Sequence, residues 1–243
     1  MTILKVSIVV LLMNIINLSS VAYAEQNNGT EEALGVKNKS IISIASLTAK
    51  GDLITLKPEL NAGLDAGLTV NQIKEVLVHL YAYCGFPRSI RGLQTFMEVL
   101  SERKSKGITD DLGAEATAIL DERNKYERGK DVLGELTKSP QNSTLTGYSA
   151  FAPVIDRFLK EHLFADIFER DVLTYAEREL VTISVLSSIG GVEPMLRSHL
   201  SICLNVGISP GQLYEFVEII KLKVGEQEAN SAKTVLDEVL KQH

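Results

Sequence analysis

An internal repeat constrains the fold of this chain more than any other feature of the sequence. Residues 56–100 align without gaps on residues 196–240, at a constant offset of 140 and with ten identities in 45 positions. The residues of the first copy that are identical in the second are Leu56, Leu60, Leu64, Gly67, Gln72, Glu75, Gly85, Glu98, Val99 and Leu100. Upstream, IISIASLTAKG fits VTISVLSSIGG when one residue is inserted at a glycine break. The chain therefore contains two copies of one unit, and we expect the copies to dock on each other to hide their excess apolar faces.

Each copy has the pattern of helices separated by glycines. Thr174 precedes an acidic turn, and apolar residues then recur at helical spacing, which predicts an N-capped amphipathic helix. Gly190-Gly191 ends this helix, and Glu193-Pro194 opens the next one, because proline is tolerated at the first helical position. No extended stretch alternates with period two, so the sequence predicts an all-α fold of two tandem helical repeats.

The first 24 residues have the form of a secretory signal peptide. Lys5 gives a short basic start, and VSIVVLLMNII is an apolar run too short to span a bilayer comfortably. Ala22-Tyr23-Ala24 has the small-x-small form of a cleavage site. We therefore expect residues 1–24 to be removed from a protein that is exported to the periplasm or secreted. An uncleaved anchor is the alternative.

The rest of the chain is expected to divide into a first repeat with an N-terminal arm, 25–123, and a second repeat, 124–243. Residues 26–38 are polar and lack periodicity, which predicts a mobile arm. Residues 113–136 carry apolar residues at helical spacing among charged ones, which predicts one long surface helix. Residues 152–168 predict a further amphipathic helix that leads into the second repeat.

The composition excludes several classes of partner and scaffold. The formal net charge is −6, which argues against nucleic acid or an anionic membrane surface as a partner, because neither would meet a basic patch. After signal cleavage no remaining segment is expected to cross a membrane. Two cysteines can form one bridge or stay free, and they are too few for a disulfide scaffold. No metal site is expected.

Two stretches carry a family resemblance. The second repeat and its approach read YERGKDVLGEL and then APVIDRFLKEHLFADIFERDVLTYAERELVTISVLSSIGGVEPMLRSHLSICLNVGIS, and the first repeat reads GLTVNQIKEVLVHLYAYCGFPRSIRGLQTFMEVL. Together they resemble the carboxymuconolactone decarboxylase family. The resemblance implies an all-helical fold of the alkylhydroperoxidase D type, usually assembled as trimers or hexamers. It also implies a small-molecule substrate and chemistry that needs no cofactor.

The peroxidase branch of that superfamily resembles the pattern E-x11-C-x2-C-x3-H, in which two thiols do redox work and the Glu and His relay protons. This sequence keeps Glu179 and His199 with one extra residue of spacing, and it has Gly191 and Pro194 in place of the cysteines. The dithiol is absent. His199 is therefore a candidate general acid or base, with Glu179 as its partner. The plainer alternatives are a capped histidine at the core edge and a helix first-turn carboxylate.

Cys84, in YCGFPR, is the remaining candidate thiol. It ends one helix and stands just before Pro87, the expected start of the next, so the two helix dipoles act on it in opposite directions. A buried small hydrophobe at a helix junction is the other interpretation, and for Cys203 the apolar stripe of Leu196 and Leu200 favours that interpretation.

The two copies differ in complementary ways, which suggests one composite site per chain. The first copy has Glu59 at the position of His199, but it retains the segment Tyr83–Arg88. We therefore expect proton-transfer residues from the second repeat and pocket residues from the first. Arginines could bind an anionic substrate by charge-assisted hydrogen bonds, with surface solvation as the alternative. The expected substrate-binding residues are Arg88, Arg91, Arg197, Tyr83 and Glu59.

Three functions remain open from the sequence. The first is cofactor-free decarboxylation or proton transfer on a small unsaturated lactone or related carboxylate, with His199 as general acid or base. The second is a thiol-dependent peroxidase that uses Cys84. The third is a helical binding module without catalysis. Apolar surface left over on the helices predicts a homo-oligomer, and the resemblance favours a trimer.

Overall fold

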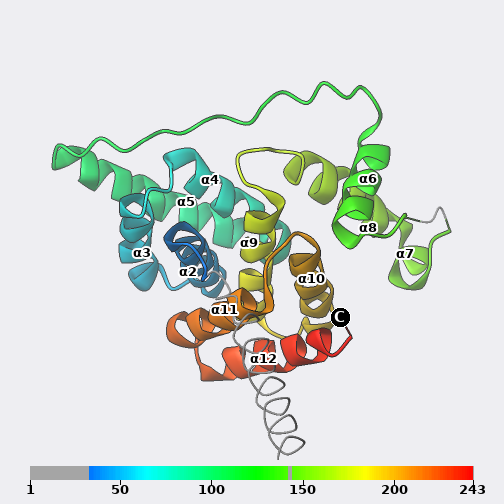
Figure 1. Cartoon of the computed structure of the whole chain (residues 1–243). Coiled ribbons are helices and arrows are strands. Elements are labelled where there is room, and N and C mark those ends of the chain that lie inside the picture. Colours follow the sequence, from blue (N-terminus) through cyan, green and yellow to red (C-terminus); the bar gives the residue numbers. More distant parts are fainter. Residues whose placement is uncertain (1–32, 142–143, 243) are drawn as a thin grey trace, which may run out of the picture. The chain divides into compact units, whose positions relative to one another are not determined.

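The computed structural model describes residues 33–141 and 144–242, and it contains helices and no strand within these ranges. The all-α prediction is confirmed, and the predicted signal peptide lies outside the described residues. The first repeat consists of α2 (Val36–Lys50), α3 (Leu53–Asp65), α4 (Val70–His79) and α5 (Tyr81–Ser105). The second consists of α9 (Tyr175–Ile189), α10 (Glu193–Asn205), α11 (Pro210–Lys223) and α12 (Glu226–Leu240) (Figure 1). Between them come α6 (Lys125–Thr137), α7 (Gly147–Phe151), α8 (Pro153–Phe158) and a π-helix, η1 (Leu159–Ile167).

The repeat seen in the sequence is visible in the helix caps. Thr69 caps α4 and Gln72 completes a capping box, and Ser209 and Gln212 do the same for α11. The glycines that precede these caps, Gly67 and Gly207, have φ of 90° and 92°. Such angles suit glycine because it has no Cβ to clash in the left-handed region. The sequence identities at Gly67 and Gln72 thus have a structural cause.

The core lies where α2 and α9 pack against each other (Figure 1). Every residue from 41 to 49 in α2 and from 178 to 188 in α9 is buried. A helix that is buried all round belongs at the centre of a protein, and the remaining helices of both repeats cover these two. Apolar residues of both copies form one continuous cluster. The repeats therefore dock on each other within the chain, as the sequence predicts.

Two exchanged ion pairs tie the copies together. The Glu75 carboxylate of the first repeat lies 2.8 Å from the Arg178 guanidinium of the second. At the equivalent positions, Glu215 of the second repeat lies 2.5 Å from Lys39 of the first. The first pair is buried, whereas Lys39 and Glu215 are partly exposed. The two ion pairs thus occupy equivalent positions in the two repeats, but one pair is buried and the other is partly exposed.

The prediction of one long helix over residues 113–136 is wrong in its first half. Residues 109–122 have no regular secondary structure, and the helix α6 begins only at Lys125. The Asn71 side chain binds the carbonyl groups of Gly113 and Ala114, and Thr117 binds Asp171, so the segment is held by other parts of the fold instead of by its own backbone.

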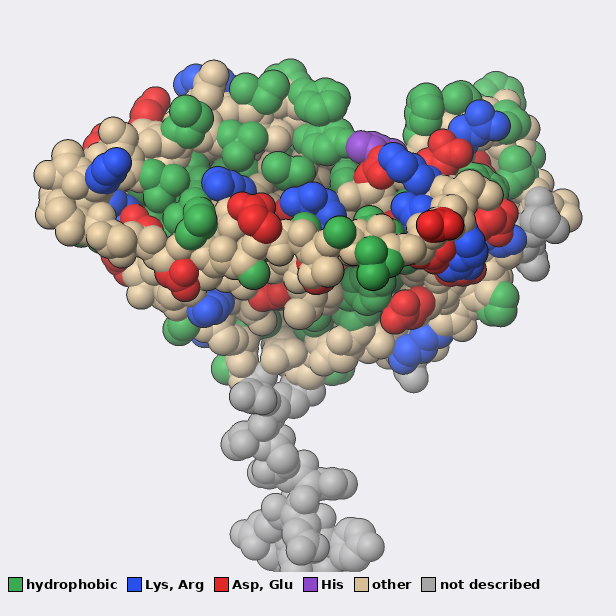
Figure 2. Space-filling view, turned by 90° about the horizontal axis from the view of Figure 1, so that it is seen from above, with side chains coloured by type: hydrophobic (Ala, Val, Ile, Leu, Met, Phe, Trp, Pro, Cys, Tyr) green, Lys and Arg blue, Asp and Glu red, His purple; other side chains and the backbone are tan. Residues whose placement is uncertain are grey.

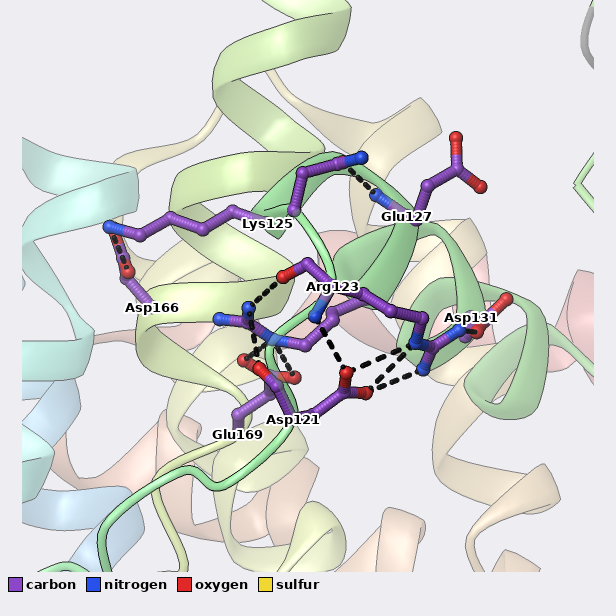
Figure 3. A network of polar contacts seen from close by, with 9 residues as sticks. Asp121, Arg123, Lys125, Glu127, Asp131, Asp166 and Glu169 are labelled. Carbon is purple, nitrogen blue, oxygen red and sulfur yellow. Dashed lines mark hydrogen bonds and ion pairs between the residues drawn. The ribbon is translucent and has the colours of Figure 1, made fainter.

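Charged side chains fix the point where this segment ends and α6 begins (Figure 3). Asn124 caps α6 by accepting a hydrogen bond from the Glu127 amide. Arg123 pairs with Asp121 and Asp131 at 2.7 and 2.6 Å. Lys125 binds Asp166 of η1 at 2.7 Å, which links the start of α6 to the π-helix.

One further prediction is confirmed in outline. The helix expected over residues 152–168 is present from Pro153 to Ile167, but its second part, Leu159–Ile167, is the wider π-helix. The π-helix lies close to α6 because Gly129 has no side chain: a Cβ there would lie 1.8 Å from the Lys160 carbonyl oxygen. Of the mobile arm expected over 26–38, residues 26–32 lie outside the described residues, and the prediction is wrong for the last part, because α2 begins at Val36 and Leu34 is buried. None of the helices in the described ranges is long and apolar enough to cross a membrane.

Candidate active site at the junction of the two repeats

His199 and Glu179 form a buried pair on neighbouring helices of the second repeat. The His199 Nδ1 atom lies 2.8 Å from the Glu179 Oε2 atom. Glu179 has no exposed side-chain surface, and His199 retains 12%. A carboxylate can only accept in this bond, so Nδ1 carries the hydrogen and Nε2 is left to exchange a proton with a ligand. The pair therefore has the form of an oriented acid–base group.

The second oxygen of Glu179 makes this carboxylate dependent on His199. Oε1 is buried and has no hydrogen-bond partner among the described residues. A buried carboxylate is costly unless its charge is compensated, and His199 supplies the one hydrogen bond that the carboxylate receives within the described part of the chain. The Glu179 carboxylate thus depends on His199 for the one hydrogen bond that it receives among the described residues.

Tyr83 brings the first repeat to this pair. Its ring meets the His199 imidazole edge to face, with the ring centroids 5.8 Å apart and the planes at 84°. Tyr83 lies two residues before Gly85, whose φ of 81° and ψ of 159° break α5 near its start. The break allows the chain to turn before Pro87 restarts the helix, as the sequence predicts. Burial, and next the charge of Glu179, raises the pKa of the Tyr83 hydroxyl, so Tyr83 is a neutral hydrogen-bonding group.

A chain of buried polar groups holds Tyr83 from behind. Thr182 Oγ1 lies 3.2 Å from the Tyr83 hydroxyl, 2.9 Å from His79 Nε2 and 2.9 Å from the Arg178 carbonyl oxygen. The carbonyl can only accept, so it takes the single Thr182 hydrogen. The lone pairs of Thr182 then accept from Tyr83 O–H and from His79 Nε2–H. Only this arrangement of hydrogens gives each of the three partners a hydrogen bond with the Thr182 hydroxyl.

The same reasoning fixes the tautomer of His79. Arg178 Nη1 lies 3.2 Å from His79 Nδ1, and an arginine can only donate, so Nδ1 accepts and Nε2 carries the hydrogen. Burial, followed by the positive charges of Arg178 and His199, lowers the pKa of His79 well below its usual value. Arg178 is held in turn by Glu75 at 2.8 Å. The buried chain Glu75–Arg178–His79–Thr182–Tyr83 thus runs between the repeats.

The sequence interpretation overlooked His79, Thr182 and Arg178. His79 lies at the end of the buried face of α4, four residues before Tyr83, and its ring centroid lies 5.6 Å from that of Tyr83. The one available signal was this spacing, a histidine and a tyrosine one helical turn apart beside an apolar stripe. The partners of these residues lie about 100 positions away in the chain, where periodicity carries no information.

The structure gives neither cysteine the surroundings of a reactive thiolate. Both are free. Burial raises the pKa of Cys84 to about 11, against a smaller opposing effect of Arg88, and its Sγ donates to the Leu80 carbonyl oxygen at 3.2 Å. Burial, and next the charge of Glu179, raises the pKa of Cys203 well above its usual value. Both groups are therefore thiols, not thiolates, at neutral pH.

The three arginines expected to bind substrate are dispersed. Arg197 pairs with Glu238 of α12, and Arg91 donates to Gln94 at 2.6 Å. Arg88 is exposed, and its charge acts on the nearby Cys84 thiol. Within the described residues no recorded hydrogen bond or ion pair joins any of the three to His199 or Glu179. Arg88 is the closest to Tyr83 along the chain.

Glu59 also lies away from His199. It belongs to α3 and forms an ion pair of 2.7 Å with Lys223 of α11. By the repeat offset, Glu59 and Lys223 occupy the positions that His199 and Tyr83 occupy in the other half. The two halves of the chain thus carry a histidine–tyrosine contact on one side and a fixed ion pair on the other. Among the described residues no cluster of three or more His, Cys, Asp or Glu is arranged to hold a metal ion.

Comparison with known proteins agrees with the duplicated fold. The model of the carboxymuconolactone decarboxylase family matches this chain twice, over residues 20–96 and 153–238. A 4-carboxymuconolactone decarboxylase from Acinetobacter baylyi is 29% identical over 123 residues, which cover 91% of that protein and 50% of this chain. Nearly the whole of that relative thus corresponds to half of the present chain.

Proposed function

The chain belongs to the carboxymuconolactone decarboxylase family, and from this premise we propose that it catalyses cofactor-free decarboxylation or proton transfer on a small unsaturated lactone or related carboxylate. The observation that carries the proposal is the bond between His199 Nδ1 and the buried Glu179 carboxylate, 2.8 Å long, which leaves Nε2 available to a ligand. His199 acts as the general acid or base, and Glu179 orients its ring.

The proposed reaction places one demand on a titratable group. Cleavage of the bond between the carboxylate carbon and the ring releases CO₂ and leaves its electron pair on the ring carbon, delocalised through the unsaturated lactone as a dienolate. One proton must then reach carbon. A protonated His199 donates it from Nε2, and solvent restores the proton afterwards. No electron leaves or enters the system, so the balance requires no redox cofactor.

The other residues are assigned to positioning and binding. Tyr83 bounds one side of His199, and the buried Thr182 and His79 hold the Tyr83 hydroxyl in place. Arg88 is the candidate for the substrate carboxylate, because Arg197 is engaged by Glu238 and Arg91 by Gln94, whereas Arg88 packs beside Gly51 with no ion pair among the described residues. The proposal assigns one composite site to each chain.

The test uses the substrate class that the name of the relative indicates. We expect the parent protein to release CO₂ from 4-carboxymuconolactone or a closely related unsaturated lactone acid, and His199→Gln to lose about 10²-fold or more in kcat. Glutamine can still donate to Glu179 but cannot transfer a proton. His162→Gln is the matched control, because His162 also binds a carboxylate, Asp166 at 3.1 Å, but on the surface. Equal turnover by the two variants would refute the role of His199.

A peroxidase that uses Cys84 is not favoured by any contact of that residue. With a pKa of about 11, the thiol is almost fully protonated at neutral pH, whereas peroxide reacts with thiolates. A non-catalytic binding module remains the outcome if no member of a panel of unsaturated lactone acids is turned over.

We propose, from the sequence of residues 1–24 alone, that the protein is exported. Removal of this segment would leave a mature protein that begins at Glu25. N-terminal sequencing of the protein recovered from the periplasm, the medium and the membrane fraction tests the proposal, and a start at Met1 in the membrane fraction would favour an uncleaved anchor.

A further inference from the structure

A cavity of about 230 Å³ lies where α9 ends and α10 begins. Its walls come from the second repeat, together with Lys50 at the end of α2, and neither His199 nor Glu179 lines it. The polar side chains among its lining residues are Lys50, Ser187, Ser188, Glu193, Gln227, Glu228 and Ser231. The proposed acid–base chemistry makes no use of this cavity.

The equivalent place in the first repeat is filled by a guanidinium group. Gly51 ends α2 as Gly190 ends α9, and a Cβ added to Gly51 would lie 1.4 Å from Arg88 Nη1. A Cβ added to Gly190 or Gly191 would meet no atom within 4 Å. The residue at the position of Arg88 in the second repeat is Glu228, which reverses the charge. Glu228 turns instead to Lys50, 2.9 Å away, and the space stays open.

The end of α9, which lines this cavity, lacks a cap that the end of α2 has. In the first repeat the Gly51 N–H caps α2 by binding the Leu47 and Thr48 carbonyl oxygens at 2.9 and 3.0 Å. No such cap bond closes α9 at Gly190 within the described chain. The last carbonyl groups of a helix carry a partial negative charge, and those of α9 lack the cap donor that Gly51 supplies to α2.

Two side-chain observations agree with a cationic ligand. Ser187 lines the cavity, is 5% exposed, and its hydroxyl has no hydrogen-bond partner in the described residues. Lys50 balances only one of the two lining carboxylates, Glu193 and Glu228, so one negative charge remains. That charge opposes an anionic lactone acid and favours a cation with several N–H donors.

We propose that this cavity binds a small molecule that carries a guanidinium group, in the place that Arg88 fills in the first repeat. The guanidinium lies against Gly190-Gly191, donates to the carbonyl groups at the end of α9, and shares the Glu228 carboxylate with Lys50. The cavity volume of about 230 Å³ is several times the roughly 30 Å³ that one water molecule takes in the liquid, so a guanidinium group with a short alkyl chain can fit.

The test is titration with ethylguanidine, followed by the amide NMR signals of Gly190 and Gly191. Ethylurea is the matched control ligand, because it has nearly the same shape without the charge. We expect saturable shifts with ethylguanidine that ethylurea does not produce. Ethylammonium should bind more weakly, because it is a compact charge without the planar fork of donors. Absence of saturable binding, or equal binding of ethylurea, would overturn the proposal.

Variants at the start of α12 separate the site from a general charge effect. Glu228→Arg recreates the arrangement of the first repeat and should abolish binding, and Glu228→Gln should weaken it about tenfold or more, because the ligand loses a charged acceptor. Glu226→Arg makes the same change on an exposed residue outside the cavity and should bind like the parent. Binding that Glu228→Gln leaves unchanged would contradict the assignment even if Glu228→Arg folded poorly. The NMR titration does not depend on lactone turnover, so absence of guanidinium binding would not contradict the proposed reaction.

Discussion

Glu59 Oε1 and Lys223 Nζ lie 2.7 Å apart at the positions that His199 and Tyr83 occupy in the other half of the duplicated chain. One half therefore presents a titratable ring beside a tyrosine, and the other closes the same place with an ion pair. Both halves thus share the same arrangement of helices, but only one half has the candidate acid–base residues. We therefore propose one active site per chain.

The first prediction concerns this ion pair. Glu59→Gln should leave kcat and KM within about twofold of the parent and lower the free energy of unfolding by about 0–1 kcal/mol, because both partners are partly exposed. Steady-state kinetics and chemical denaturation check it. A large rise in KM would instead assign Glu59 to substrate binding, as the sequence first suggested.

The framework could be predicted from sequence because its causes are local. Gly67 and Gln72 recur at the offset of 140 since a left-handed turn and a capping box need them. The helix predicted over residues 113–136 was wrong in its first half because the causes there are not local. The periodicity of this segment is helical, but Asn71 and Asp171, which are distant in sequence, bind its first part. Local patterns cannot show such competition.

The second prediction concerns His79 and pH. Because burial lowers its pKa in the folded state, the unfolded state binds the proton first as the solution is acidified. Above the unfolded pKa of about 6.5, neutral His79 imposes no proton-linked loss of stability. As the pH falls below this value, the free energy of unfolding decreases by at most about 1.4 kcal/mol per pH unit. Denaturation at pH 7.5, 6.5 and 5.5 measures the slope.

The control replaces the titrating group. His79→Gln should flatten the slope between pH 6.5 and 5.5 while it preserves polar partners for Arg178 and Thr182. His79→Ile should flatten it too but cost about 1–3 kcal/mol at pH 7.5, because an Arg178 N–H is left without its acceptor. An unchanged slope in both variants would assign the pH dependence to other groups.

The third prediction concerns Cys84. With its pKa raised to about 11, the rate of alkylation by iodoacetamide should rise about tenfold per pH unit between pH 7 and 9. Mass spectrometry of the labelled peptide measures it, and Cys203, which is fully buried, should remain unlabelled in the folded protein. A rate at pH 7 that equals the rate at pH 9 would indicate a thiolate and would revive the peroxidase alternative.

The fourth prediction concerns assembly, which stays an expectation from the sequence. On α5 the side chains of Phe86, Ile90 and Met97 follow helical spacing and are 62%, 49% and 68% exposed. Hydrophobic side chains also gather on both sides of a hollow at the upper rim of the face shown in Figure 2, with a histidine at its edge. Such surface favours association of copies.

Light scattering at micromolar concentrations should give three times the chain mass. Ile90→Glu should lower that mass, whereas Ile54→Glu, which changes an exposed isoleucine of α3, should not. Monomer mass for the parent protein would exclude the trimer.

The candidate site was only partly predictable. His199 and Glu179 are on adjacent helices of one repeat, so their proximity could be expected from spacing, and the motif resemblance pointed to them. Arg178 and His79 come from different repeats and meet only through the docking of the copies. Their roles depend on tertiary packing, which the pattern of either repeat does not encode.

A kinetic cycle of Glu179→Gln, His199→Gln and the double variant, measured as kcat/KM for decarboxylation of the lactone acid, tests whether the two residues act together. If the two residues act as one acid–base unit, each single variant loses about 10²–10⁴-fold, and the double variant loses no more than the worse single one. Losses that multiply in the double variant, or single variants as active as the parent, would contradict the account.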